Sequence, residues 1–319
     1  MSLISIAMCT YNGERFLKEQ LDSLVNQSYK NIELIICDDC STDNTVRIIE
    51  EYMKEDDRIK FYQNKTNLGF VKNFEKAISL CSGDYIALAD QDDIWKLEKL
   101  AVFIENIKDN ILIYSDAELI DDNADKLNKH LIADKKNLVS GKCNKAFLFF
   151  NCVSGNTMMF KKELIDKILP IPSEFSFHDI WIAFISSSIG TITYTNESMI
   201  YYRRYSEQVT ASKQRSYQSF FDRLKQKKEQ YKKSARSSLN DFRCLAKLNF
   251  LDSDTIKLLK ILVDHFENYD KGFFNKELYD LLILDLDSFF AIKQQKKRKK
   301  YARKISSKLK LNQLLFFSM

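Results

Sequence analysis

The chain has little that would place it in or across a membrane. None of its apolar runs approaches the roughly 18 residues that a membrane-spanning helix needs. Met1 is followed by Ser-Leu-Ile-Ser-Ile-Ala rather than by the basic segment that opens a secretory leader. Its seven cysteines are an odd number, which does not suit a full set of disulfide bonds. We therefore expect a cytoplasmic protein whose thiols are free.

Histidine and proline are also scarce, with three and two residues respectively. Cys37 and Cys40 form a C-x-x-C pair, but no second pair follows at zinc-finger spacing. The two Asp residues between them disfavour a thiolate, so we expect neither a zinc finger nor a redox pair. The two prolines, Pro170 and Pro172, predict a loop, and no linker rich in glycine and serine divides the sequence.

Acidic residues are absent from residues 291–319, although this segment carries ten Lys or Arg. Because the whole chain has a formal net charge of +5, residues 1–290 carry −5. A basic tail suits an anionic membrane surface, into which the apolar residues of 311–317 would insert. The alternative is a solvated, frayed chain end. Nothing in residues 1–290 resembles a nucleic-acid-binding module, so we expect no nucleic acid partner.

Apolar runs alternate with amphipathic stretches in the first third of the chain. The runs at 3–8, 32–37, 59–62 and 85–89 predict strands, and the helical spacing of apolar residues between them predicts helices. This order indicates an α/β fold with a mostly parallel sheet covered by helices. Residues 111–203 predict strands at 111–114, 158–160 and 198–202 and a helix at 180–188.

The pattern becomes helical and charged from about residue 217. We therefore predict a domain at 1–212, with a regular first half at 1–110 and a less regular second half at 111–212. A helical C-terminal appendage at 213–319 would follow. The apolar stretch at 258–290 predicts either the core of this appendage or a contact in a homo-oligomer.

Three polar clusters follow predicted strands: Thr10-Tyr11-Asn12, Asp38-Asp39-Cys40-Ser41 and Asp90-Gln91-Asp92-Asp93. Ligands bind beyond the carboxyl ends of the strands in parallel sheets, so the three clusters together predict a binding site. Grouped carboxylates are costly unless a cation is present, and Mg²⁺ or Mn²⁺ with oxygen ligands would satisfy them while also holding a diphosphate. The alternative for the third cluster is an acidic cap on a helix at 94–108.

The second cluster offers a carboxylate that can accept hydrogen bonds from a pyrimidine base or a ribose hydroxyl. Thr10, Tyr11 and Asn12 would place an aromatic ring and backbone amides around the same base. The alternative for the second cluster is turn and capping chemistry, which needs only one of its residues, and the alternative for the first is a turn between a strand and a helix.

The motifs occur together in one order, and this order resembles the family-2 glycosyltransferases with a GT-A fold. The resemblance covers residues 1–210 and implies that 1–110 is the nucleotide-binding half of the domain and 111–212 the acceptor half. The D-Q-D-D-I-W form is most similar to bacterial rhamnosyltransferase-type enzymes of cell-surface polysaccharide synthesis. The motifs that carry the resemblance are Met8-Cys9-Thr10-Tyr11-Asn12-Gly13, Asp38-Asp39-Cys40-Ser41-Thr42-Asp43, Asn67-Leu68-Gly69, Ser82-Gly83-Asp84-Tyr85 and Asp90-Gln91-Asp92-Asp93-Ile94-Trp95.

The resemblance implies roles for individual residues. Asp39 would bind the base and Thr10, Tyr11 and Asn12 would line the nucleotide. Asp90 would contact the donor, Asp92 would ligate the metal, Asp93 would support it, and Lys72 would reach the diphosphate.

A second group of implied roles concerns the acceptor. His178-Asp179-Ile180-Trp181 resembles the H-D-x-W segment of the family, in which the Asp is the general base, so Asp179 is the predicted base. The alternative for Asp179 is a helix N-cap. His178 would lie on the acceptor side as a packing or orienting residue rather than as a second base, and Trp181 would stack on an acceptor sugar or belong to the core. Asn156 and Thr157 would line the acceptor, or form a turn.

The segment Tyr202–Thr210 resembles the Y-R-x-H-x-x-N-x-T ending of the family, with Tyr205 and Gln208 as departures. Arg203 would approach the diphosphate, because a guanidinium matches phosphate geometry.

These patterns predict an inverting, metal-dependent transferase that moves one sugar from a UDP- or dTDP-linked donor, rhamnose by the form of one motif, to a glycan acceptor. A lipid-linked acceptor would suit an enzyme held on the inner face of the plasma membrane by its tail. Two rivals remain. A sugar nucleotidyltransferase would carry a glycine-rich, basic loop after the first strand, where this chain has Thr-Tyr-Asn-Gly. A non-catalytic scaffold with the same fold would not need the acidic cluster.

Overall fold

The computed structural model describes residues 1–132, 137–205, 220–268 and 274–307. The predictions on residues 206–210, 213–219 and 308–319 therefore lie outside the described residues.

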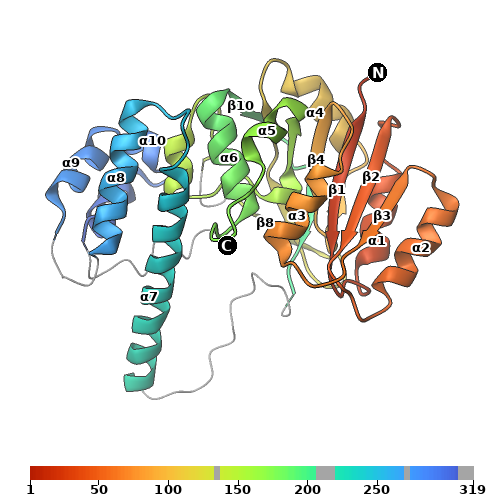
Figure 1. Cartoon of the computed structure of the whole chain (residues 1–319), viewed down its shortest axis with the longest axis horizontal. Coiled ribbons are helices and arrows are strands. Elements are labelled where there is room, and N and C mark those ends of the chain that lie inside the picture. The colour runs from red at the N-terminus through yellow and green to blue at the C-terminus, as the bar shows by residue number, and fades with distance from the viewer. Residues whose placement is uncertain (133–136, 206–219, 269–273, 308–319) are drawn as a thin grey trace.

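A seven-stranded sheet forms the centre of the first two thirds of the chain (Figure 1). β9 is antiparallel to both of its neighbours, and every other pair is parallel, as predicted. All seven residues of β2 are buried, as expected for an inner strand of a sheet that is covered on both faces. The strands in spatial order are β10 (Ile192–Tyr194), β6 (Leu112–Tyr114), β9 (Met158–Lys161), β4 (Tyr85–Ala89), β1 (Ile4–Thr10), β2 (Ile32–Asp38) and β3 (Ile59–Gln63).

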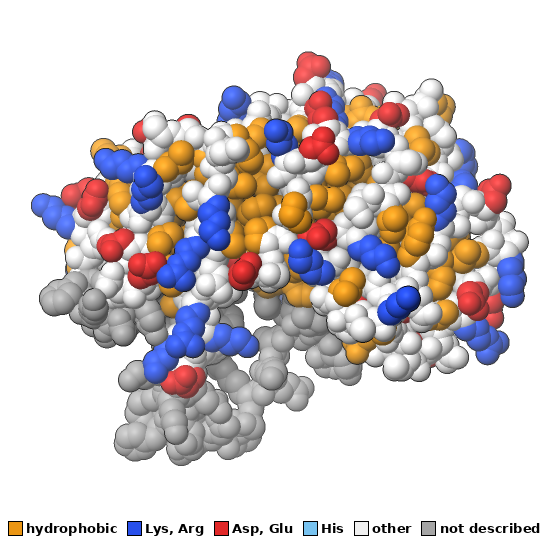
Figure 2. Space-filling view, viewed as in Figure 1, with side chains coloured by type: hydrophobic (Ala, Val, Ile, Leu, Met, Phe, Trp, Pro, Cys, Tyr) orange, Lys and Arg blue, Asp and Glu red, His pale blue; other side chains and the backbone are white. Residues whose placement is uncertain are grey.

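Helices cover both faces of the sheet. Successive residues of a strand point to opposite faces, so neighbouring apolar residues pack in two different core clusters. Ile6 of β1 packs in the core cluster that includes Leu21, from α1 (Leu17–Val25), with residues of α2 (Thr45–Glu55) and α4 (Lys99–Ile107). Ala7 packs in the other cluster, with Phe74 of α3 (Phe70–Ser79) and residues of α6 (His178–Ile189). Figure 2 shows apolar side chains gathered over α3, α5 (Ile165–Ile168) and α6, among charged side chains of both signs.

A second sheet of four strands holds the segment that follows the third polar cluster. Its order is β5 (Ile94–Trp95), β11 (Ile200–Arg203), β7 (Ala117–Ile120) and β8 (Lys126–His130). The predicted helix at 94–108 is therefore wrong in its first turn, because Ile94 and Trp95 pair with β11 and the helix begins at Lys99. Short helices occupy Asn144–Leu148, Gly155–Thr157 and Lys162–Leu164.

The C-terminal region is helical, as predicted, and lies beside α6 (Figure 1). Its core continues that of the sheet domain, because Phe149 stacks on Phe290 with ring centroids 5.8 Å apart. The apolar stretch at 258–290 supplies this core, so the appendage interpretation of that stretch is the one that the structure supports. The helices are α7 (Phe220–Leu245), α8 (Ser253–Glu267), α9 (Lys276–Leu284), α10 (Leu286–Phe289) and α11 (Gln295–Ile305).

The first part of the basic tail is a packed helix. Ala302 and Ile305 of α11 are buried, whereas Lys296, Lys299 and Lys300 are exposed. The frayed-end alternative is therefore wrong for residues up to 307. Of the helices in the described ranges, none is both long and apolar enough to cross a membrane.

Candidate functional site

The ends of β1, β2 and β4 meet at one edge of the sheet. Thr10 lies opposite Asp38 in the parallel ladder, and its hydroxyl donates a hydrogen bond of 2.9 Å to the Asp38 carboxylate. The amide of Tyr11 donates to Oε1 of Gln91 at 2.7 Å, and Nε2 of Gln91 donates to the Tyr11 carbonyl at 3.0 Å. The first turn and the acidic cluster are therefore joined directly.

The bonds between Gln91 and Tyr11 favour a glycine at position 13, because a larger residue would displace the Gln91 side chain. A Cβ atom on Gly13 would lie 2.3 Å from Oε1 of Gln91, which is well inside contact distance. Asn12 precedes it with φ of 48°, in the left-handed region that Asn tolerates. The amide of Asn12 donates a hydrogen bond of 2.9 Å to the hydroxyl of Ser41, so the first two clusters are joined as well.

Asp39 is almost fully buried at 3% exposure, and its carboxylate anchors the loop before α3. It accepts hydrogen bonds from Nδ2 of Asn64 at 2.8 Å and from the amides of Leu68 and Gly69 at 2.7 and 2.8 Å. A carboxylate has about four acceptor positions, so these bonds leave room for one more donor. The base-binding role of Asp39 remains a prediction.

Three carboxylates, those of Asp90, Asp92 and Asp93, lie close together at the end of β4, and their negative charges repel one another. Burial, followed by the charges of Asp92 and Asp179, raises the pKa of Asp90 to about 7. Burial, followed by Asp92 and Asp90, raises the pKa of Asp93 well above its usual range. Asp93 accepts hydrogen bonds from the amide of Arg203 and from the side chain of Asn156, so it points away from solvent.

A buried lysine that the sequence analysis did not single out lies behind the acidic cluster. Lys99 is fully buried, and its Nζ donates a hydrogen bond of 2.6 Å to the carbonyl of Asn156. The ammonium also lies 3.1 Å from the ring centroid of Trp95. Burial lowers the pKa of Lys99 well below its usual range, while Asp93 and Asp90 oppose this effect. Lys99 has no sequence motif, and only its helical spacing behind the cluster hinted at its place.

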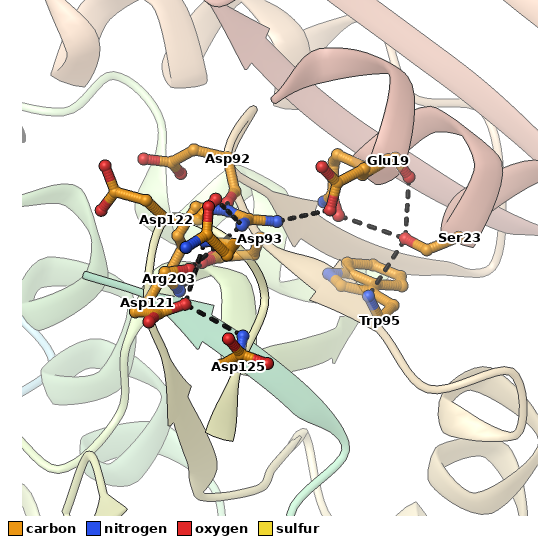
Figure 3. Close-up of polar contacts among 11 residues, drawn as sticks. Glu19, Ser23, Asp92, Asp93, Trp95, Asp121, Asp122, Asp125 and Arg203 are labelled. Carbon is orange, nitrogen blue, oxygen red and sulfur yellow. Dashed lines mark hydrogen bonds and ion pairs between the residues drawn. The ribbon is translucent and has the colours of Figure 1, made fainter. Parts of the chain in front are cut away.

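Arg203, predicted to approach the diphosphate, is instead fully buried at the end of β11. Figure 3 shows it between Glu19 and the acidic segments. Its Nε donates to the carbonyl of Asp92 at 3.0 Å, and one terminal nitrogen donates to the carbonyls of Asp121 and Asp122 at 3.1 and 3.0 Å. The other terminal nitrogen lies 2.7 Å from the Glu19 carboxylate. All three side-chain nitrogens therefore have protein partners, which corrects the phosphate assignment.

Tyr205 takes the position at which the family ending has a histidine. Its hydroxyl donates a hydrogen bond of 2.7 Å to Oδ2 of Asp92, and its ring lies 5.0 Å from the ring of Phe16. The tyrosine thus reaches the predicted metal ligand itself.

Asp179 lies in the first turn of α6, one residue inside the helix rather than at its N-cap. It accepts hydrogen bonds from the amide of Ile180 at 2.7 Å and from Nδ2 of Asn151 at 2.8 Å. Burial raises the pKa of Asp179 to about 6, which these two hydrogen bonds partly oppose. Because its charge in turn raises the pKa of Asp90, the predicted base lies near the acidic cluster.

His178 packs beside Asp179 as an apolar ring. It stacks on Phe74 with centroids 4.1 Å apart, and Phe70 lies 6.1 Å away edge-on. Neither ring nitrogen has a hydrogen-bond partner within the described part of the chain. Burial lowers the pKa of His178 to about 3, so the ring is neutral at physiological pH. The stacking and burial agree with a packing role, and contact of His178 with the acceptor remains a prediction.

Three of the remaining predictions place a side chain at the acceptor, and the structure places these side chains in the interior. Trp181 is buried, and its Nε1 donates to the carbonyl of Ile168 at 2.8 Å, so it belongs to the core. Asn156 is fully buried against Asp93, and the hydroxyl of Thr157 donates to the carbonyl of Ser154 at 2.7 Å. Their residue types suited an acceptor, but their side chains face inward.

Lys72, predicted at the diphosphate, has both of its contacts elsewhere. Its Nζ lies 2.7 Å from the carboxylate of Glu75 and donates to the carbonyl of Ile171 at 2.6 Å. Lys72 could contact the diphosphate of the sugar donor only if these two contacts were broken.

The residues present fit a divalent cation whose remaining coordination positions are filled by phosphate oxygens of a bound nucleotide and by water. Within the described ranges, no group of three or more His, Cys, Asp or Glu side chains is arranged to hold an ion. Mg²⁺ is commonly bound by one or two carboxylates together with phosphate oxygens and water. Asp92 is partly exposed beside two further carboxylates, so a cation would relieve their mutual repulsion.

A model of the family described as "Glycosyl transferase family 2" matches residues 5–169, more than half of the chain. The chain belongs to glycosyltransferase family 2. An uncharacterized glycosyltransferase of Haemophilus influenzae is 30% identical over 223 residues, which cover 66% of this chain and 68% of that protein.

A second relative of this family-2 glycosyltransferase has a fuller description. It is the UDP-Glc:alpha-D-GlcNAc-diphosphoundecaprenol beta-1,3-glucosyltransferase WfgD of Escherichia coli, 38% identical over 124 residues. The match covers 38% of this chain and spans 48% of that protein.

The solved structures confirm the GT-A fold. The crystal structure of S. aureus TarS residues 1–349 in complex with UDP-GlcNAc superposes with a TM-score of 0.59 at 19% identity, covering 96% of this chain and 88% of that one. The mannosyltransferase PcManGT from Pyrobaculum calidifontis in complex with GDP-Man and Mn²⁺ gives 0.53 at 13% identity, covering 94% and 74%.

Proposed function

We propose that this family-2 glycosyltransferase moves one hexose from a UDP- or dTDP-linked donor to a glycan acceptor, with inversion at the anomeric carbon, in the synthesis of a cell-surface polysaccharide. The observation that carries the proposal is the meeting of three strand-end clusters with Asp179. The turn at Tyr11 is bonded to Gln91, and Asp179 is close enough to Asp90 for its charge to raise the pKa of Asp90.

Asp179 acts as the general base in this proposal. A hydroxyl of the acceptor attacks the anomeric carbon while the Asp179 carboxylate takes the hydroxyl proton. The bond between the anomeric carbon and the diphosphate breaks in the same step, so the nucleoside diphosphate leaves from the opposite face. A single displacement inverts the configuration at the anomeric carbon.

Asp92 would hold the divalent cation, Mn²⁺ or Mg²⁺, which neutralises charge on the departing diphosphate when it is bound. Asp90 would accept a hydrogen bond from a hydroxyl of the nucleotide-sugar donor. The turn of Thr10, Tyr11 and Asn12 would surround the base, where Tyr11 has an exposed ring.

The identity of the donor rests on the relatives and on one motif. WfgD is described with UDP-Glc and the TarS crystals hold UDP-GlcNAc, which supports a uridine nucleotide. The D-Q-D-D-I-W form supports rhamnose, which would favour a dTDP-linked donor. The diphosphoundecaprenol acceptor named for WfgD supports a lipid-linked acceptor, and the exposed lysines of α11 would bring the enzyme to an anionic membrane.

Two matched variants test the roles of the carboxylates. Asp92→Asn should abolish the metal-dependent part of nucleotide binding, measured by calorimetry with UDP and dTDP in the presence and absence of Mn²⁺. Asp179→Asn should keep this binding and slow the release of nucleoside diphosphate from UDP-glucose, UDP-GlcNAc or dTDP-rhamnose by about 100-fold or more.

Turnover at the wild-type rate in Asp179→Asn would reject the base assignment. Turnover by the wild type is measured with a membrane extract as the source of acceptor. If the wild type binds nucleotide but turns over none of the donors, the scaffold alternative is favoured.

A further inference from the structure

The end of β11 contacts the acidic cluster through two neighbouring residues that act in different ways. Arg203 binds the backbone carbonyl of Asp92 and therefore fixes the course of the chain. Tyr205 instead binds the carboxylate of Asp92, with its hydroxyl 2.7 Å from Oδ2. Of these two contacts, only that of Tyr205 sets the direction of the Asp92 side chain.

The tyrosine ring is itself held in place. It is partly buried, and its centroid lies 5.0 Å from that of Phe16, which directly precedes α1. The same Phe16 ring lies 4.4 Å from the Arg203 guanidinium. Because the Tyr205 ring packs against Phe16, it has little rotational freedom, and its hydroxyl is a hydrogen-bond donor in a fixed position beside Asp92.

A carboxylate can accept a hydrogen bond at one oxygen while the other ligates a metal ion. A donor at the first oxygen then fixes the plane in which the second oxygen meets the ion. Such supporting hydrogen bonds commonly determine the affinity of a metal site.

We propose that Tyr205 is a positioning residue for the divalent cation of this enzyme, and that its hydroxyl orients the carboxylate of Asp92 for metal binding. The inference rests on the proposed function in one respect, the binding of a cation by Asp92. It adds that a residue beyond the acidic cluster, far away in the sequence, determines the strength of that binding.

The test is Tyr205→Phe in the full chain, which removes one oxygen and keeps the ring on Phe16. Mn²⁺ is titrated into protein saturated with UDP, and separately with dTDP, and free Mn²⁺ is followed by electron paramagnetic resonance. We expect Mn²⁺ affinity to fall by about 10- to 100-fold. Tyr194→Phe, in the edge strand β10, three strands away from β4 in the main sheet, is the matched control and should bind Mn²⁺ as the wild type does.

A second readout separates positioning from general damage. Binding of UDP or dTDP without metal should be equal in the wild type and in Tyr205→Phe, because the nucleotide turn is untouched. A loss of this metal-free binding would show that Tyr205 supports the fold of the site and would overturn the inference. Wild-type Mn²⁺ affinity in Tyr205→Phe would overturn it too while leaving the proposed function intact. A wild-type protein that binds no Mn²⁺ would end both.

Discussion

At the scale of single residues, Asp179 has the surroundings of a base that works near neutral pH. Burial raises the pKa of its carboxyl to about 6 against two hydrogen bonds, from Asn151 and from the amide of Ile180. Such a group is mostly a carboxylate at about pH 7 and still accepts a proton readily in the transition state.

We therefore expect kcat/KM for donor turnover to rise with pH and to level off above about pH 6, because only the carboxylate form of Asp179 can take the proton. Below this pH the rate should fall by about tenfold for each unit. Asp241 is a matched control, since burial also raises its pKa to about 6 and it lies in α7. Asp241→Asn should leave the pH profile unchanged, whereas a flat wild-type profile would remove Asp179 as the base.

The residues of the site were predictable in type but not always in direction. The acidic cluster and Asp179 follow from carboxylates placed at strand and helix ends, and the structure brings them together. Arg203 and Trp181 also have residue types that suit ligands, yet both side chains are buried and bonded within the protein. Sequence spacing does not contain this information, because the partners of Arg203 come from three distant segments.

At the scale of elements, β11 connects parts of the chain that are distant in sequence. It pairs with β5 on one side and with β7 on the other. Its last residue, Arg203, adds hydrogen bonds to the carbonyls of Asp92, Asp121 and Asp122. β11 therefore helps to fix the position of the acidic cluster, together with the bonds from Tyr11 to Gln91 and from Asn156 to Asp93.

Arg203→Met should lower the free energy of unfolding by about 3 kcal/mol or more, because three partly buried carbonyls lose a charged donor. Arg204→Met is the matched control. The Arg204 guanidinium lies 5.0 Å from the ring centroid of Tyr202, and the backbone hydrogen bond from Arg204 to Ile120 would remain in the variant. The free energy of unfolding of Arg204→Met should therefore fall by less than about 1 kcal/mol. Urea unfolding of the two variants gives both values, and equal losses would contradict the role given to the Arg203 side chain.

Six of the seven strands of the main sheet were predictable because they carry continuous apolar runs with turn residues between them, whereas the three-residue strand β10 was not predicted. β5 was not predictable. Its two residues continue into α4 without a break in apolar spacing, and the partner that makes them a strand lies about a hundred positions later in the chain. The second sheet as a whole depends on such pairings, which local periodicity cannot reveal.

At the scale of the whole molecule, α11 places a one-sided basic surface on the helical appendage. Lys296, Lys299, Lys300 and Arg303 are exposed, while Ala302 is buried. Removing this segment would open the appendage core, so charge is better tested by substitution than by deletion.

Replacing the four exposed residues by Gln should weaken sedimentation with vesicles rich in anionic lipid by at least about tenfold, since each basic residue near the surface contributes about 1 kcal/mol. The control replaces four exposed lysines of the sheet domain, Lys18, Lys54, Lys65 and Lys129, and so has the same net charge. Equal loss in both variants would show that net charge alone acts, and α11 would then have no special part in membrane binding.

The measurement that tests the central claim most directly is the thermal unfolding of the wild-type chain with UDP, dTDP, GDP and CDP, each with and without Mn²⁺ or Mg²⁺. A ligand at about 100 times its dissociation constant adds about 2.7 kcal/mol of stability, which for a chain of this size is a rise in Tm of about 4 °C. We predict such a rise with UDP or dTDP that requires the metal and is lost in Asp92→Asn. An unchanged Tm with every nucleotide, with and without metal, would contradict the account.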